Sequence, residues 1–190
     1  HAYGPPYTEN TDPLLLTSFF QDVQQVAQSK EISPILLSIH ECLSEPHRIN
    51  PNLKNERDGH NTPLHYAAKG GHTTLAKMLL RAGADVSAAN GLGQTAFHLS
   101  ASGRSHRHER VLRLLLLERL RNDNDDDVVG LVDRAGITAL ERAIEVGNAG
   151  SVSVLLDRNK ALYGEGGLRL VLLRRLLSKA LRLRAERVGM

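Results

Sequence analysis

The chain has 190 residues, 41% of them hydrophobic, and a formal net charge of +3. Its length suits a single domain with a continuous core, and its one cysteine, Cys42, excludes an internal disulfide framework and favours a reducing compartment. No apolar run approaches the roughly 18 residues that span a bilayer, and no secretory signal stands near the start. We therefore expect a cytoplasmic protein, with the nucleus or delivery into a host cell as alternatives.

The first part of the chain predicts an arm followed by two helices. Residues 1–11 contain glycine and consecutive prolines and are expected to form a flexible arm. Asp12 is placed to cap a first helix, whose apolar residues recur at helical spacing. A second helix is predicted over residues 32–43, and residues 49–53 are expected to form a strand-like finger. We therefore assign residues 12–57 to an atypical helix pair.

One pattern recurs three times in the middle of the chain. Its copies are marked by Thr62, Thr95 and Thr138, each of which precedes an apolar segment with helical spacing. Thr62 and Thr95 are 33 residues apart, whereas Thr138 follows 43 residues after Thr95, so ten additional residues lie between the last two copies. A recurring interval of this length is typical of proteins that stack one supersecondary unit.

The recurring residues have physical roles in a helix pair. Each threonine hydroxyl can accept a hydrogen bond from N–H groups of the first helical turn. Gly83 is expected to end the second helix of the first copy in the left-handed conformation, and Asn159 to do the same in the third copy. Small residues allow neighbouring helices to approach closely; they are Ala67, Ala68, Ala101 and Ala143. The apolar face of the first copy's second helix comprises Leu75, Met78, Leu79 and Leu80.

The stretch Thr62-Pro63-Leu64-His65-Tyr66-Ala67-Ala68, with the residues that follow it as far as Val86, resembles an ankyrin repeat. The resemblance implies an all-α solenoid of helix pairs with short hairpin fingers and with atypical capping helices at both ends. It also implies that His65 and His98 hydrogen-bond the neighbouring repeat, and that Glu141, which replaces this histidine in the third copy, weakens the link. The repeats would occupy residues 58–89, 90–132 and 133–165.

The second repeat carries the additional residues. A long helix is predicted over residues 108–121, and it runs into residues 122–127, which include four aspartates. Negative charge at a helix C-terminus opposes the helix dipole, so we expect an exposed acidic loop that could attract a basic partner. A calcium loop is not expected, because Val128 stands where the turn needs glycine and Arg134 where the bidentate glutamate would be. We expect no metal and no cofactor.

The resemblance implies a non-catalytic scaffold that binds another protein through its fingers and the first helix of each repeat. We therefore predict an adaptor, inhibitor or targeting module, and no small-molecule substrate. Aromatic and guanidinium side chains often anchor interfaces, and apolar finger tips are unusual on a surface. The partner-binding residues predicted on these grounds are Lys54, Glu56, Arg57, Tyr66, Lys69, Leu92, Gln94, Leu99, Arg134, Ile137, Arg142 and Glu145.

Residues 166–190 predict a basic, leucine-rich C-terminal helix. We favour a helix that caps the third repeat, with its basic side chains reaching outward. The alternative is association with an anionic membrane or nucleic acid through this helix. Another alternative is that the chain is the recognition arm of an enzyme whose catalytic domain lies outside this sequence. The secondary basic patch comprises Arg174, Arg175, Lys179, Arg182 and Arg184.

Overall fold

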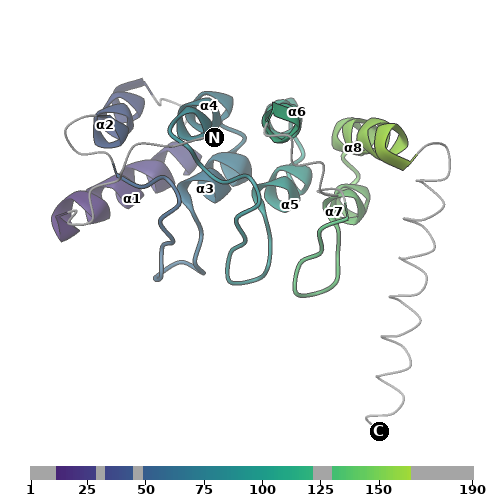
Figure 1. The fold of residues 1–190 in the computed structure, drawn as a ribbon, viewed down its shortest axis with the longest axis horizontal. Helices are drawn as coiled ribbons and strands as arrows, with labels where there is room; N and C mark the ends of the chain where they lie inside the picture. Colours follow the sequence, from purple (N-terminus) through teal and green to yellow (C-terminus); the bar gives the residue numbers. More distant parts are fainter. Residues whose placement is uncertain (1–11, 29–32, 45–48, 122–129, 164–190) are drawn as a thin grey trace, which may run out of the picture.

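The computed structural model describes residues 12–28, 33–44, 49–121 and 130–163. Its described helices stack as pairs in two rows, which confirms the predicted all-α solenoid (Figure 1). The inner row comprises α1 (Pro13–Gln28), α3 (Pro63–Gly70), α5 (Ala96–Ala101) and α7 (Ala139–Val146). The outer row comprises α2 (Ser33–Leu43), α4 (Thr73–Arg81), α6 (His106–Arg121) and α8 (Ala149–Tyr163).

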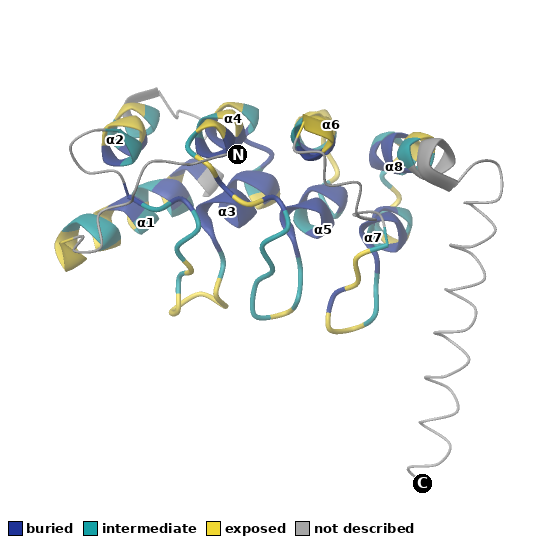
Figure 2. Ribbon diagram, in the orientation of Figure 1, coloured by how far each residue is buried: buried dark blue, intermediate teal, exposed yellow. Residues whose placement is uncertain are grey.

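The core lies between the two rows. Figure 2 shows buried residues where inner and outer helices face each other, and intermediate or exposed residues along most of the loops below the inner row. Side chains from both rows fill this layer, including Leu64 of α3, Leu79 of α4 and Leu112 of α6, each 0 or 1% exposed. The small residues predicted at close helix contacts are all fully buried: Ala67, Ala68, Ala101 and Ala143. Any larger side chain at these positions would separate helices that are packed at close range.

The predicted helix boundaries follow from capping residues. Thr62, Thr95 and Thr138 are the N-cap residues of α3, α5 and α7, each with extended backbone angles. Pro63 occupies the first turn of α3, where its missing N–H group costs no hydrogen bond. Gly83 follows the last turn of α4 with φ of +92°, as predicted. The Asp12 carboxylate accepts a hydrogen bond from the Leu14 N–H group (2.9 Å) at the start of α1.

Two predicted boundaries are wrong. Helix α8 does not end at Asn159 but continues to Tyr163, because Lys160, Ala161 and Leu162 are good helix formers and no glycine or proline interrupts them. Helix α6 begins at His106, two residues earlier than predicted. The Ser105 carbonyl oxygen accepts from the His108 N–H group (3.0 Å), so the first helical turn starts there.

Residues 49–53 do not form a strand-like finger but the turn that leads into one. The Asn50 side chain accepts from the Asn52 N–H group at 2.9 Å, and Asp85 makes the same contact with Ser87 at 2.8 Å one repeat later. The N-terminal helix pair thus enters the first finger in the same way as a regular repeat does. The expected arm, the acidic loop and the C-terminal helix, at residues 1–11, 122–129 and 164–190, lie outside the described residues.

Candidate functional site

Three hairpin fingers extend below the inner row (Figure 1). Each is closed by a backbone hydrogen bond: Asn55 N to Asn61 O (2.8 Å) in finger 1, Asn90 N to Gln94 O (2.9 Å) in finger 2, and Asp133 N to Ile137 O (3.0 Å) in finger 3. Finger 1 therefore encloses residues 56–60, whereas the others enclose residues 91–93 and 134–136. Its tip is two residues longer and carries the exposed side chains of Glu56, Arg57, Asp58 and His60.

The fingers are joined edge to edge into one continuous surface, which we call the finger row. The Gly91 N–H group donates to the Gly59 carbonyl oxygen at 2.7 Å, and the Arg134 N–H group donates to that of Leu92 at 2.9 Å. The Asn90 amide also donates to the Asn61 side chain at 2.9 Å. Because these bonds fix the spacing of the tips, a partner meets a preorganised surface.

Two buried histidines connect fingers 2 and 3 to the first helix of the preceding repeat. The Thr62 N–H group donates to His65 Nδ1 at 3.1 Å, so the proton of the neutral ring lies on Nε2. His65 Nε2 then donates to the Gln94 carbonyl oxygen in finger 2 at 2.8 Å. His98 repeats this arrangement with the Ile137 carbonyl oxygen in finger 3, at 3.1 Å.

The histidine rings also change how the helices are capped. Because His65 Nδ1 is an acceptor, the Thr62 hydroxyl hydrogen-bonds to it at 2.7 Å, and the two residues form a capping box at the start of α3. Burial lowers the pKa of both His65 and His98, and the hydrogen bonds to carbonyl oxygens offset this only in part. The two rings are therefore held in the neutral form.

Glu141 closes a local capping box in the third repeat. Its Oε2 accepts from the Thr138 N–H group at 2.7 Å, and its own N–H group donates to the Thr138 hydroxyl at 3.2 Å. Capping boxes are also present at Thr62 with His65 and at Thr95 with His98, as expected of the three threonines. Within the described part of the chain, Glu141 makes no hydrogen bond to another repeat.

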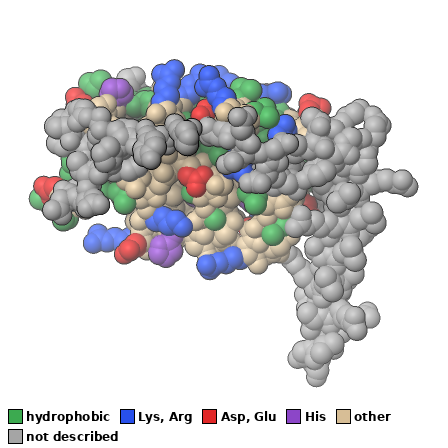
Figure 3. Space-filling view, viewed as in Figure 1, with side chains coloured by type: hydrophobic (Ala, Val, Ile, Leu, Met, Phe, Trp, Pro, Cys, Tyr) green, Lys and Arg blue, Asp and Glu red, His purple; other side chains and the backbone are tan. Residues whose placement is uncertain are grey.

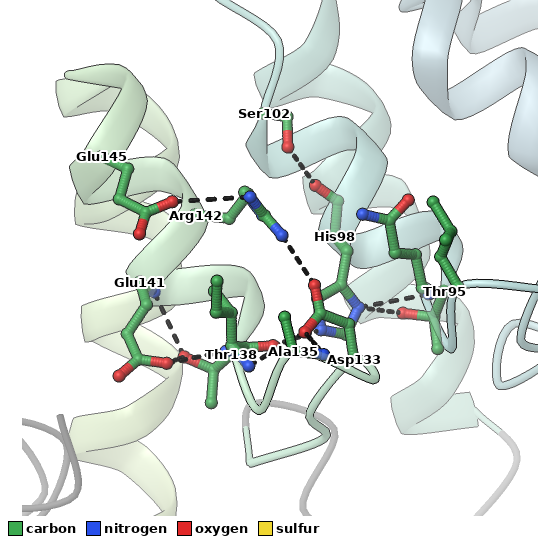
Figure 4. A network of polar contacts seen from close by, with 12 residues as sticks. Thr95, His98, Ser102, Asp133, Ala135, Thr138, Glu141, Arg142 and Glu145 are labelled. Carbon is green, nitrogen blue, oxygen red and sulfur yellow. Dashed lines mark hydrogen bonds and ion pairs between the residues drawn. The ribbon is translucent and has the colours of Figure 1, made fainter. Parts of the chain in front are cut away.

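Asp133 organises the backbone of finger 3 (Figure 4). Its carboxylate accepts from the N–H groups of Ala135 (2.9 Å) and Ile137 (3.0 Å), and its other oxygen lies 2.7 Å from Arg142 Nη2. Burial alone would raise the pKa of Asp133, but the Ile137 N–H group and the Arg142 guanidinium together hold it below its ordinary value. Arg142 Nη1 also lies 3.5 Å from Glu145 of α7, so one guanidinium nitrogen pairs with the finger and another within the helix.

Tyr66 is not an exposed anchor, contrary to the prediction. It is 4% exposed, and its hydroxyl donates to the Asp58 carboxylate at 2.7 Å. The same oxygen accepts from Asn55 (3.1 Å) and from Gln24 of α1 (3.2 Å). Helix α1 packs against α3 and covers this position, so Tyr66 ties α1, α3 and finger 1 together from within.

The other predicted residues divide by exposure. Exposed side chains belong to Lys54, Glu56, Arg57, Lys69, Leu92, Arg134 and Glu145, and partly buried ones to Gln94, Leu99, Ile137 and Arg142. Leu92 is 62% exposed at the tip of finger 2. The structure adds four exposed residues that the prediction omitted: Asp58, His60, Leu131 and Val132. The predicted basic patch in residues 174–184 lies outside the described residues.

Two other kinds of site are not found among the described residues. No helix among them is long and apolar enough to cross a membrane. Nor do three or more histidine, cysteine or carboxylate side chains in this part of the chain come together as metal ligands.

Comparison with known proteins identifies the repeat. The sequence model described as ankyrin repeats, in three copies, matches residues 25–127. Helices α7 and α8 lie beyond that match and extend the stack by one pair.

Two plant proteins align with 98 residues of the chain. They are "Probable E3 ubiquitin-protein ligase XBOS33" of Oryza sativa subsp. japonica, 38% identical, and "E3 ubiquitin-protein ligase XBAT33" of Arabidopsis thaliana, 37% identical. The alignments cover 52% of this chain and 17% of each plant protein. The chain belongs to the ankyrin-repeat family, whose repeats form non-catalytic modules for protein–protein interaction.

Proposed function

We propose that the chain binds a partner protein through the finger row and the adjoining inner helices, and that it performs no chemistry itself. The observation that carries this proposal is the hydrogen-bonded alignment of the three tips. Backbone hydrogen bonds join the tips from Gly59 to Arg134.

The tips differ in chemistry, and this difference supports a specific partner. Finger 1 presents two carboxylates and one guanidinium in its exposed loop, whereas finger 2 presents Leu92 and finger 3 presents Arg134. An exposed leucine between charged neighbours is costly in water and favourable when a partner covers it. We propose a partner segment with an apolar side chain that meets Leu92, flanked by charged groups that pair with fingers 1 and 3.

Capture from a cell extract tests this proposal. The chain carrying Arg57→Ala, Leu92→Ala and Arg134→Ala should lose its principal captured protein, because three tips lose a contact and the fold is retained. The matched control carries Lys77→Ala, Arg81→Ala and Leu117→Ala on the outer row and should capture that protein as the wild type does. If the finger variant still captures every protein that the wild type captures, the finger row is not the binding surface.

A second role follows from the two plant relatives, which are named as E3 ubiquitin ligases. We propose that the repeats could serve as the recognition arm of such an enzyme, with catalysis supplied by another domain or subunit. Ubiquitylation of the captured protein should then rise when the wild-type chain is expressed with its native flanking sequence, but not with the finger variant. If expression of the wild-type chain leaves ubiquitylation of the captured protein unchanged, this role is contradicted and the binding proposal stands.

A further inference from the structure

Charge is segregated between the two helix rows. Helices α4 and α6 together contain seven lysine and arginine residues and two glutamates. The inner helices α3, α5 and α7 contain two basic and two acidic residues. In the space-filling view, basic side chains gather along the upper edge, where the outer row lies, opposite the fingers (Figure 3).

Four of these seven basic groups have no acidic partner among the residues that the structure describes. Lys77 and Arg81 of α4 and Arg107 and Arg110 of α6 are exposed, and none forms an ion pair with another described residue. Both glutamates of α6 are already engaged. Glu109 accepts from Arg113 at 2.9 Å, which lowers the pKa of its carboxyl group, and Glu118 lies 3.8 Å from Arg121. Counted over the described residues, a surplus of positive charge therefore remains on α4 and α6. We call these four residues, together with Arg113, the outer basic face.

Exposed leucines lie on the same helix face. Leu117 is 61% exposed and Leu120 is 49% exposed, and with Arg110 and Arg113 they recur at intervals of three and four residues along α6. The face thus passes from arginine in the first half of the helix to leucine in its second half. Helix α2, at one end of the outer row, exposes Leu37 in addition, at 64%.

This combination fits an anionic membrane surface better than a nucleic acid. Phosphates of a nucleic acid would pair with the arginines but would leave the leucines in water, and aromatic stacking platforms are absent from the described outer helices α4 and α6. At a lipid interface, basic groups meet the headgroups while leucines enter the apolar boundary. Helices α4 and α6, which carry these side chains, are neighbours in the outer row (Figure 1).

We propose that the outer basic face docks on an anionic lipid surface. Lys77, Arg81 and Arg110 meet the lipid phosphates and carboxylates, and Leu117 and Leu120 enter the interface. The finger row, which extends from the opposite side of the solenoid, then faces away from the membrane (Figure 1). A protein partner can bind there while the scaffold remains on the lipid.

Vesicle flotation with the full chain tests whether the basic residues of the outer face bind anionic lipid. Wild-type chain should partition to phosphatidylserine-containing vesicles and not to pure phosphatidylcholine vesicles. Neutralising one basic residue is expected to lower partitioning about fivefold, so Lys77→Gln/Arg81→Gln/Arg110→Gln should lower it roughly a hundredfold. The matched control, Lys54→Gln/Arg57→Gln/Arg134→Gln, removes the same charge from the fingers and should retain most of the binding.

A second pair of variants tests the leucines. Leu117→Ser/Leu120→Ser should weaken vesicle binding about tenfold or more, whereas Leu14→Ser/Leu92→Ser, which alters two exposed leucines elsewhere, should not. Thermal unfolding of each variant checks that the fold is intact. The proposal is overturned if the wild-type chain does not bind anionic vesicles. It is also overturned if the outer charge variant binds as the wild type does, because residues 164–190 would then carry the binding. Equal losses in control and test variants, or stronger binding to duplex DNA than to vesicles, would also overturn it.

Discussion

At the scale of single residues, the two inter-repeat histidines depend on being neutral. Protonation of His65 or His98 would place an N–H group on Nδ1, directly opposite the threonine N–H group that now donates to it. Burial adds to this penalty, because a charged imidazole is poorly solvated between two helices. The same ring nitrogens that join the repeats therefore make the joint sensitive to acid.

The sign of the pH effect follows from these pKa shifts. The unfolded chain binds protons at these histidines below the ordinary pKa of 6.5, whereas the folded chain binds them only at lower pH. Their stabilising effect is complete above that value and is lost as pH falls from it toward the lowered pKa. Urea unfolding should thus give a smaller free energy at about pH 5.5 than at about pH 7.5.

Replacing the rings tests this assignment. His65→Gln/His98→Gln should be less stable at neutral pH but should lose less on acidification over that interval. His40→Gln, at an exposed histidine, should keep the wild-type pH dependence. A wild-type-like decrease in the double variant would show that other groups titrate.

Tyr66 gives a second prediction at this scale. Tyr66→Phe removes a hydroxyl that hydrogen-bonds three side chains, and it leaves Asp58, Asn55 and Gln24 without this partner. The free energy of unfolding should fall by about 1–2 kcal/mol in urea titration. Capture of the partner protein should be unchanged. Lost capture with unchanged stability would instead identify Tyr66 as a binding residue.

At the scale of elements, one backbone position differs among the fingers. Gly93 and Gly136 adopt φ of +73° and +72°, and His60 occupies the corresponding place in finger 1 with φ of +58°. A Cβ atom at position 93 would lie 2.9 Å from the Arg134 N atom, which donates to the neighbouring finger. Glycine is therefore required in finger 2, whereas the longer finger 1 tolerates a strained histidine.

This comparison predicts two substitutions with opposite effects on stability. Gly93→Ala should destabilise the chain by about 1 kcal/mol or more, because it adds strain and disturbs the contact between fingers. His60→Gly should stabilise it by up to about 1 kcal/mol, because it relieves the left-handed strain. Thermal unfolding of both variants shows whether each substitution raises or lowers the stability of the chain. Destabilisation by His60→Gly would mean that the imidazole makes a contact worth more than the strain.

The sequence predicted the repeated elements well because their residues have local roles. Threonine caps, buried alanines and the glycine after α4 are set by helix geometry, and all lie where expected. The burial of Tyr66 could not be predicted in this way, because α1 covers it and lacks the repeat pattern. The finger predicted at residues 49–53 lies later in the chain, because the first finger closes between Asn55 and Asn61.

At the scale of the whole molecule, the solenoid presents two surfaces of different chemistry. The finger row is nearly balanced in charge and carries a single strongly exposed leucine, whereas the helices of the outer basic face carry more basic than acidic side chains. A stack of short helix pairs separates the two surfaces, so substitutions on one should act independently of the other. Chains that combine the finger variant with the outer charge variant should show both binding losses and no additional loss of stability.

Hydrogen exchange on the complex with the captured partner tests the central claim most directly. If the finger row is the binding surface, amide protection should increase in residues 55–61, 90–94 and 133–137 and stay unchanged in α4 and α6. Protection that increases in the outer helices while the fingers exchange as in the free chain would contradict it.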